Sequence, residues 1–307
     1  MDRRCLIVLL AALLSGCTAS LPTQGVPAPG TYEQDIAGLD RGYRVHIPPG
    51  YDGRTPMPLV VALHGIFSSG SGMESWSGLD AVADRRGFIV VYPEGTASAL
   101  GLGRHWNSGH VWLKAHDEKV DDVAYLGSVI EDVAGRLAVD RKRVAMCGHS
   151  NGGMMVYRFA AERPGVLSAI AVVAGTIGGK PVGPEPEWRI PVPAQPVPVL
   201  VIHGTDDASV PYWSLRRKGT RGPGTMLPVS ESVAFWMAAN RCDPVPQVER
   251  AQGGRVLRYS WKGAAPVRLV ALVGWDHRWP GPAFIEADDP LAGFDAAEEM
   301  GNFFSEF

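Results

Sequence analysis

Six apolar runs along the chain lack the alternation of polar and apolar positions that marks a strand exposed on one face. They span residues 59–65, 88–95, 144–150, 169–175, 199–205 and 267–274. Continuous apolar runs of this length are typical of strands covered on both faces, as in the interior of a parallel sheet. We therefore predict six interior strands.

Segments with helical periodicity separate several of these strands, chiefly 121–137, 154–162 and 230–240. Strand and helix thus alternate along most of the chain, which favours an α/β fold with a mostly parallel, doubly wound sheet flanked by helices. Sheets of this kind carry their functional residues just beyond the carboxyl ends of the strands. The residues that end each apolar run are therefore the candidates for chemistry.

Two further segments complete the predicted fold. Residues 32–51 pattern as strand, turn and strand, which predicts an antiparallel hairpin at the amino-terminal edge of the sheet. Residues 178–198 are rich in proline and glycine, and the strand pattern resumes directly after them. We interpret this stretch as an excursion over the strand ends and predict one domain over 31–307.

The amino terminus has the pattern of a secretory signal, in which two arginines precede roughly ten apolar residues. The run is shorter than the twenty or so residues that a membrane-spanning helix needs. Its ending, Leu-Ser-Gly-Cys, resembles the bacterial lipoprotein box. We predict a signal peptide over 1–16, a lipid anchor on Cys17, a tether over 17–30 and a location in the cell envelope. The alternative is an ordinary secretory peptide cut near Ala19.

Composition and charge exclude several classes of function. The 307 residues carry a net charge of −3 without a block of like charges, so capture of nucleic acid or of an anionic membrane surface has no support. A small neutral substrate fits better, with membrane contact only through the lipid anchor. No pair of cysteines or histidines has zinc-site spacing, so no metal is expected. Cys147 is expected to be a buried thiol, and we do not expect it to pair with Cys242.

The residues Gly148-His149-Ser150-Asn151-Gly152 match the G-x-S-x-G nucleophile elbow. The motif follows a predicted strand and precedes a predicted helix, which is the context it requires. Its glycines leave room for a sharp turn that exposes the serine hydroxyl. Ser150 is therefore the candidate nucleophile, in preference to a serine that merely lies in a glycine-rich turn.

A serine nucleophile needs a histidine base and a carboxylate that orients the histidine, and this fold places them in the chain order Ser, acid, His. Two histidines follow Ser150. His203 ends the strand at 199–205 with no plausible acid before it, so His277 is the candidate base. The loop after His203 offers both Asp206 and Asp207 as the acid, and spacing alone does not choose between them.

The oxyanion of a tetrahedral intermediate needs two convergent N–H donors. One is expected from the backbone of Asn151, directly after the nucleophile. The second is expected from Ile66, which follows His64-Gly65 at the end of the first apolar run. For His64 itself we favour a structural role, since a histidine at this place more often fixes the loop by hydrogen bonds.

Taken together, these motifs resemble the poly(3-hydroxybutyrate) depolymerase and feruloyl esterase-like branch of the α/β-hydrolases. The resemblance rests on "PLVVALHG", "WNSG", "GHSNGG", "IHGTDDASVPY" and "HRWPGP", in that order along the chain. The family pattern H-G-T-x-D-x-x-V-P-Y, laid on 203–212, selects Asp207 as the acid. The pattern H-x-W-P-G marks His277 and places Trp279 beside the site.

The resemblance also implies that Trp106 lines the substrate cleft, where an indole could stack on an aromatic or sugar ring; a core position is the alternative. Two departures from the family pattern affect the cleft. Gly274-Trp275-Asp276 precedes His277 where the family usually has three glycines. Ile66 stands where many relatives have a small residue or cysteine.

The predicted function is that of an extracytoplasmic serine esterase with no cofactor. Its substrate could be a hydroxyalkanoate polymer or oligomer, a feruloyl or acetyl ester of plant polysaccharide, or a small generic ester. One alternative is a serine peptidase of the same fold. Another is a non-catalytic binding lipoprotein on a hydrolase scaffold, which the presence of all three triad candidates disfavours.

Overall fold

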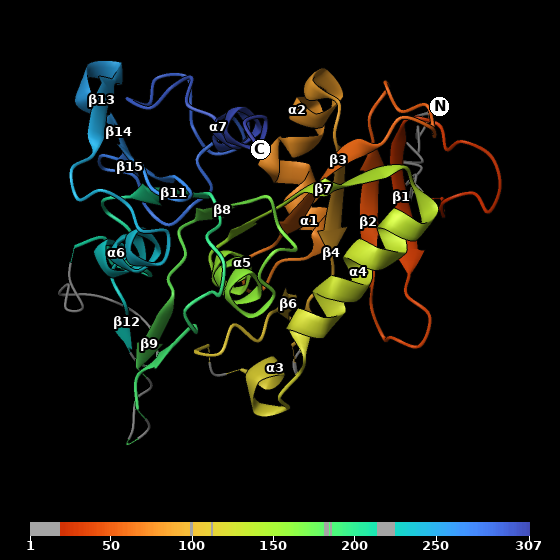
Figure 1. The fold of residues 1–307 in the computed structure, drawn as a ribbon, viewed down its shortest axis with the longest axis horizontal. Coiled ribbons are helices and arrows are strands. Elements are labelled where there is room, and N and C mark those ends of the chain that lie inside the picture. The colour runs from red at the N-terminus through yellow and green to blue at the C-terminus, as the bar shows by residue number, and fades with distance from the viewer. Residues whose placement is uncertain (1–18, 99–100, 112, 181–183, 185, 214–224) are drawn as a thin grey trace, which may run out of the picture.

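A computed structural model describes residues 19–98, 101–111, 113–180, 184, 186–213 and 225–307 (Figure 1). Its centre is a ten-stranded sheet in the order β1-β2-β4-β3-β7-β8-β11-β15-β14-β13. The six strands in the middle are parallel and coincide with the six predicted from the apolar runs. They are β3 (Met57–Leu63), β4 (Ile89–Pro93), β7 (Val139–His149), β8 (Ala169–Val173), β11 (Val199–Gly204) and β15 (Val267–Leu272).

Both edges of the sheet are antiparallel. The predicted hairpin is confirmed: β1 (Gly30–Asp35) pairs with β2 (Gly42–Ile47), which in turn pairs with β4. At the opposite edge β14 (Val256–Trp261) pairs with β15, and β13 (Gln247–Ala251) pairs with β14. This second antiparallel pair was not predicted, because four of the five residues of β13 are exposed and leave no apolar pattern.

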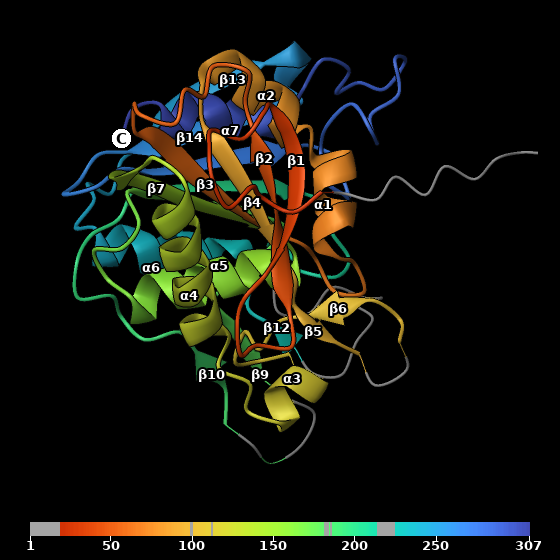
Figure 2. The same ribbon diagram turned by 90° about the vertical axis from the view of Figure 1, so that its right-hand side faces the viewer.

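Helices cover the sheet on both faces, as the fold class requires (Figures 1 and 2). One face packs against the three predicted helices α4 (Asp122–Arg136), α5 (Asn151–Glu162) and α6 (Val229–Ala239). The other packs against α1 (Gly70–Ser77), α2 (Leu79–Arg86) and α7 (Ala296–Phe304), which were not predicted. Two separate hydrophobic clusters result, one on each face.

Short elements lie outside this layered body. The excursion over 178–198 contributes β9 (Gly178–Lys180) and β10 (Trp188–Arg189), which form a small sheet with β12 (Thr225–Met226). A second ladder joins β5 (Thr96–Ala97) to β6 (Arg104–His105). The remaining elements are helix α3 (Lys114–Asp117) and the 3₁₀ turn η1 (Gln252–Gly254). The elements α3, β5 and β6 lie together at one end of the molecule (Figure 2).

The amino-terminal segment is docked on the body from the first described residue onward. Leu21 is buried in the hydrophobic cluster beneath α4, and the Ala19 carbonyl accepts the N–H of Glu33 at 2.9 Å. The predicted signal peptide and the candidate lipid attachment at Cys17 lie outside the described residues. None of the helices in the described part of the chain is long and apolar enough to span a membrane.

Cys147 and Cys242 are both free thiols. Cys147 lies on β7 and is completely buried, which raises the pKa of its thiol far above the ordinary range. Cys242 follows α6, and its thiol lies 3.6 Å from the Ala265 carbonyl. A buried, protonated thiol is chemically inert, so Cys147 contributes packing to the strand that carries the elbow.

Candidate active site

Ser150 stands at the turn between strand β7 and helix α5. Its φ of 53° and ψ of −120° fall where residues other than glycine are rarely found, so the backbone is strained there. The Ser150 N–H donates to the Val173 carbonyl at 2.8 Å. A Cβ on Gly152 would run into the backbone of Leu63 and His64. The turn therefore has the sharp strand-to-helix geometry of a nucleophile elbow, and glycine beside it is required for space.

His277 links Ser150 to Asp207 through both nitrogens of its ring. Its Nε2 lies 2.8 Å from Ser150 Oγ, and its Nδ1 lies 2.7 Å from Asp207 Oδ2. The ionised carboxylate can only accept, so Nδ1 carries the proton and the lone pair of Nε2 faces the serine hydroxyl. The three residues follow β7, β11 and β15, whose carboxyl ends share one edge of the sheet.

Asp207 is completely buried and is surrounded by donors. Its Oδ1 accepts the backbone N–H groups of Ser209 and Val210, both at 2.8 Å. Burial alone would raise the pKa of this carboxyl, but hydrogen bonds from His203 and His277 outweigh burial and hold the pKa well below its ordinary value. Asp206, the other acid that the sequence offered, is exposed to solvent. The structure thus places Asp207, charged, against the imidazole.

Two backbone amides near Ser150 come from Asn151, the next residue along the chain, and from Ile66, which lines the same pocket as Ser150. Asn151 is the first residue of α5, so its N–H has no helical acceptor. Ile66 follows Gly65, whose Cα is close enough to the elbow that a Cβ there would lie 3.5 Å from the Ser150 Cβ. Within the described residues, neither amide donates to a protein acceptor. Two free donors beside Ser150 are what an oxyanion site needs.

An aromatic pocket of about 260 Å³ opens beside Ser150 and His277. Trp76 forms its centre, with ring centroids 5.4 Å from Trp279 and 6.1 Å from Phe284, both edge to face. Trp279 was expected beside the site and lines the pocket. Trp76 and Phe284 were missed, because no motif includes them: Trp76 lies on α1, and Phe284 lies two residues beyond "HRWPGP" on the loop before α7.

His149, the variable residue of the elbow motif, also lines this pocket. Its Nε2 lies 2.8 Å from the His277 carbonyl, which can only accept, so Nε2 carries the proton. Burial lowers the pKa of His149 to about 4, so the ring is neutral at physiological pH. The rings of His149 and His277 lie 5.3 Å apart. The motif could have pointed to this residue, but nothing in the sequence predicted its bond to the loop that carries His277.

Known proteins with similar sequences are esterases. Residues 41–183 match the family described as esterase PHB depolymerase. The protein NocK of Nocardia uniformis subsp. tsuyamanensis, whose name classes it as an esterase, is 31% identical over 268 residues, which cover 81% of this chain and 73% of that protein. The chain belongs to the PHB depolymerase family of esterases. It is therefore a carboxylic ester hydrolase, and its substrates are esters.

Other relatives of this esterase differ in the substrates that their names give. Feruloyl esterase C of Emericella nidulans is 30% identical over 285 residues, which cover 87% of this chain and 89% of that protein. The solved acetyl xylan esterase from Aspergillus awamori has a TM-score of 0.62 at 15% identity and covers 90% of this chain and 99% of that chain. At this low identity, the structural similarity establishes only that the two proteins share a fold, which is that of an α/β-hydrolase.

Trp106 packs behind the loop that carries Ile66 in the esterase. The side chain is completely buried, and its indole N–H donates to the His64 carbonyl at 2.9 Å. The expectation that Trp106 lines the cleft is thereby corrected in favour of the core position, since no ring surface faces solvent. The Asn151 side chain accepts the Trp106 backbone N–H at 2.7 Å, which ties this support to the elbow.

His64 has the structural role expected of it in the esterase. Its Nε2 accepts the N–H of Gly95 at 3.1 Å, and its Nδ1 donates to the Gly65 carbonyl at 2.8 Å. Burial lowers the pKa of His64 to about 4, so the ring stays neutral. The neutral ring fastens the loop that carries Ile66 to the loop after β4.

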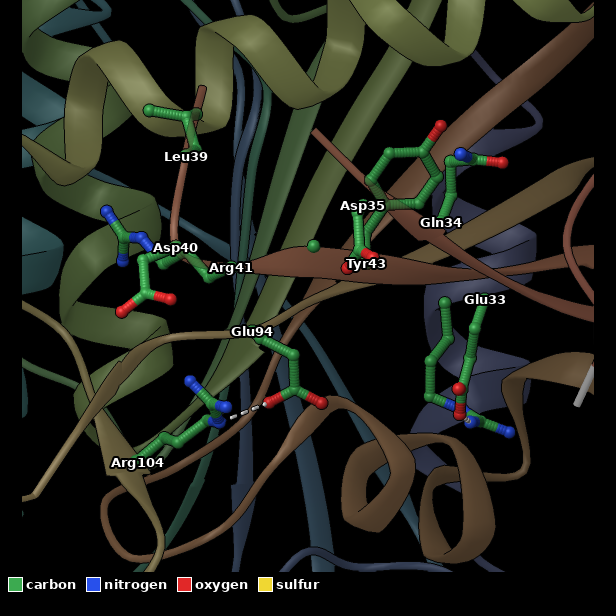
Figure 3. Close-up of a pocket in the computed structure, with 11 residues that line it drawn as sticks. Glu33, Gln34, Asp35, Leu39, Asp40, Arg41, Tyr43, Glu94 and Arg104 are labelled. Carbon is green, nitrogen blue, oxygen red and sulfur yellow. Dashed lines mark hydrogen bonds and ion pairs between the residues drawn. The ribbon is translucent and has the colours of Figure 1, made fainter. Parts of the chain in front are cut away.

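A larger pocket of about 480 Å³ lies at the β1–β2 edge of the esterase (Figure 3). Glu94 and Arg104 point toward one another across it, with Oε2 and Nε 3.1 Å apart. Glu94 also accepts the Gly70 N–H at 3.1 Å, and Arg104 donates to the Gly95 carbonyl at 2.9 Å. No triad residue lines this pocket, and its ion pair braces the loops that follow β3 and β4.

Proposed function

We propose that this esterase works through an acyl-enzyme on Ser150. Ser150 Oγ attacks the ester carbonyl carbon while its proton passes to His277 Nε2. When the tetrahedral intermediate collapses, His277 returns that proton to the leaving alcohol. Water then attacks the acyl carbon with His277 again as base, which releases the carboxylic acid and restores the serine. The observation that carries the proposal is the continuous chain of hydrogen bonds from Ser150 through His277 to Asp207.

The oxyanion of each intermediate would be held by the amides of Ile66 and Asn151. Each such donor is typically worth about a hundredfold to a thousandfold in rate, because it is aimed at the charge before the charge develops. The Asn151 amide also stands at the positive end of the α5 dipole, which favours an anion there. Bonds from Trp106 to His64 and Asn151 support the rigidity that this role needs.

A turnover assay with p-nitrophenyl esters tests the proposal. We expect hydrolysis by the wild-type chain, labelling of Ser150 by a fluorophosphonate, and loss of turnover by about 10⁴-fold or more in Ser150→Ala. Correctly folded protein that neither hydrolyses the esters nor takes the label would favour the binding lipoprotein instead. Turnover of peptide p-nitroanilides at a comparable kcat/KM would favour a serine peptidase.

The aromatic pocket favours esters with a planar ring near the scissile bond. Trp76 and Phe284 are half-buried and present ring surface that packs well against another ring, while the buried Trp279 packs edge to face against Trp76, and the pocket adjoins Ser150 directly. A feruloyl group has such a ring. An acetyl group would leave the pocket empty, and a hydroxybutyrate unit would fill it without ring contacts.

Parallel release assays on methyl ferulate, hydroxybutyrate oligomers and acetylated xylan distinguish these substrate classes. We expect the highest kcat/KM on methyl ferulate, and we expect Trp76→Ala to lower that value about tenfold or more while hydrolysis of p-nitrophenyl acetate changes little. A preference for the oligomers or the xylan would overturn the assignment to aromatic esters without affecting the proposed mechanism.

We also propose that the esterase is exported and held at the cell envelope by lipid on Cys17. The support comes from the sequence alone, namely the apolar signal and the Leu-Ser-Gly-Cys ending. Labelling of cells with a radioactive fatty acid, for wild type and Cys17→Ala, tests this proposal. Label that persists in Cys17→Ala would place the lipid on another residue, and label absent from both chains would leave an ordinary secretory peptide as the better interpretation.

A further inference from the structure

His203 is a second histidine in contact with the acid of the triad. It lies near the end of β11, four residues before Asp207, and its side chain is completely buried. Its Nε2 is 3.2 Å from Asp207 Oδ2 and 3.0 Å from the Val210 carbonyl oxygen. The sequence disfavours His203 as the base, because no plausible acid precedes it, and predicts no other role for it.

The partners of His203 determine that its Nε2 is a donor. A carbonyl and an ionised carboxylate can only accept, so Nε2 carries a proton, which it donates to the Val210 carbonyl at 3.0 Å and, over the longer contact of 3.2 Å, shares with Asp207 Oδ2. In the part of the chain that the structure describes, Nδ1 is buried with no hydrogen-bond partner. The ring is therefore a fixed donor, directed at the loop that holds Asp207.

Asp207 consequently receives four donors, two on each oxygen. Oδ1 takes the backbone amides of Ser209 and Val210, whereas Oδ2 is shared between His277 and His203. We propose that His203 is a positioning residue, which orients the Asp207 carboxylate toward His277 and limits how strongly that carboxylate pulls on the Nδ1 proton. This inference rests on the proposed role of the triad.

Because Asp207 Oδ2 is shared between two histidines, the pH dependence of kcat/KM should depend on His203. His277 acts as base only while its Nε2 is unprotonated, and a carboxylate with fewer other donors stabilises the imidazolium more strongly. Without the His203 bond, the acid limb of kcat/KM should move to higher pH. Among the described residues, the other titratable or charged groups near this site are Tyr212 from the acid loop, with its ring 6.2 Å from His203, His149 from the end of β7, and Arg278, which lines the pocket beside His277.

Three variants test the proposal. His203→Phe keeps the ring and removes the donor, while His203→Gln places an amide donor near the former Nε2. His46→Phe is the matched control, because His46 is also buried against carboxylates, those of Asp80 and Asp84, yet contacts no member of the triad. Each variant is checked for folding by circular dichroism before its kinetics are measured on p-nitrophenyl acetate.

In His203→Phe we expect kcat to fall about tenfold with little change in KM, and the acid limb of kcat/KM to rise by about half a pH unit. His203→Gln should recover most of kcat and the original limb, and His46→Phe should behave as wild type. Unchanged kcat and pH profile in a folded His203→Phe would overturn the proposal. If His203→Phe does not fold, His203→Asn replaces it, since its amide is too short to reach, and equal profiles for the Asn and Gln variants would overturn the proposal.

Failure of this inference is distinguishable from failure of the proposed function. The triad is tested by Ser150→Ala and by fluorophosphonate labelling, neither of which depends on His203. A wild-type chain that takes the label, combined with a His203→Phe variant of normal profile, would remove only the positioning role.

Discussion

Ser150 carries backbone strain at the position from which we propose that it attacks the ester. At φ 53° and ψ −120° a Cβ is unfavourable, whereas glycine adopts such angles at little cost. Ser150→Ala and Ser150→Gly both remove the hydroxyl but differ in this strain. We expect the glycine variant to be more stable than the alanine variant by about 1 kcal/mol, although both lose activity. Urea unfolding measures the difference, and equal midpoints would show that the turn is not strained.

His149 should matter for catalysis through the backbone that it holds. Its Nε2 donates to the His277 carbonyl at 2.8 Å, so His149→Leu would free the loop that carries the base. We expect kcat to fall about tenfold, since small displacements of a catalytic group are costly. His149→Gln, which can still donate, should lose less. Steady-state assays on p-nitrophenyl acetate measure kcat for both variants, and equal losses of kcat would indicate that His149 acts through packing alone.

The residues that the sequence could identify are those marked by chemistry and chain order. Ser150 is set by the elbow motif and His277 by its place after the last apolar run, whereas the choice of Asp207 over Asp206 needed a family pattern. Contacts across the fold could not be read from the chain. Trp76 and Phe284 meet only because α1 and the loop before α7 pack on the same face.

At the scale of elements, the prediction succeeded where both faces of a strand are buried. Such strands leave continuous apolar runs, as in β8 and β11. Helices α1 and α2 were missed because each has only eight residues, and α1 begins with Gly-Ser-Gly, which resembles a loop. Strand β13 was missed because an exposed edge strand needs no apolar face.

The close approach of α5 to β3 is a testable property of these elements. A Cβ on Gly152 would strike the backbone at the end of β3, so Gly152→Ala must displace either the elbow or the oxyanion loop. We expect a loss of about 2 kcal/mol or more in unfolding free energy, together with loss of activity. Gly135→Ala is the control, because that glycine lies within α4 with open space around it and should gain about 0.5–1 kcal/mol. A tolerated Gly152→Ala would show that the two elements can separate.

At the scale of the whole molecule, buried histidines link stability to pH. Burial lowers the pKa of His64, His110 and His149 to about 4 in the folded chain. Between pH 6.5 and 4 the unfolded chain therefore binds protons that the folded chain does not, so stability is lost as the pH falls through this range. Asp80 acts in the opposite direction, since burial raises its pKa to about 6 and the folded chain takes up a proton that the unfolded chain does not.

Near pH 5, unfolding lets the three histidines take up about three protons and makes Asp80 release about one, so the net uptake is about two protons. The free energy of unfolding should therefore fall by about 2 to 3 kcal/mol for each unit by which the pH is lowered there. Urea midpoints measured from pH 7.5 down to 4 test the sign and the slope. Asp80→Asn removes the opposing group and should steepen the loss between pH 6 and 4. A stability that stays flat from pH 7 to 4.5 would contradict the assignment, because it would mean that these three histidines take up protons in the folded chain as readily as in the unfolded chain. Since two of these three rings hold the oxyanion loop and the loop of His277, acid should disorder the catalytic edge as it weakens the fold.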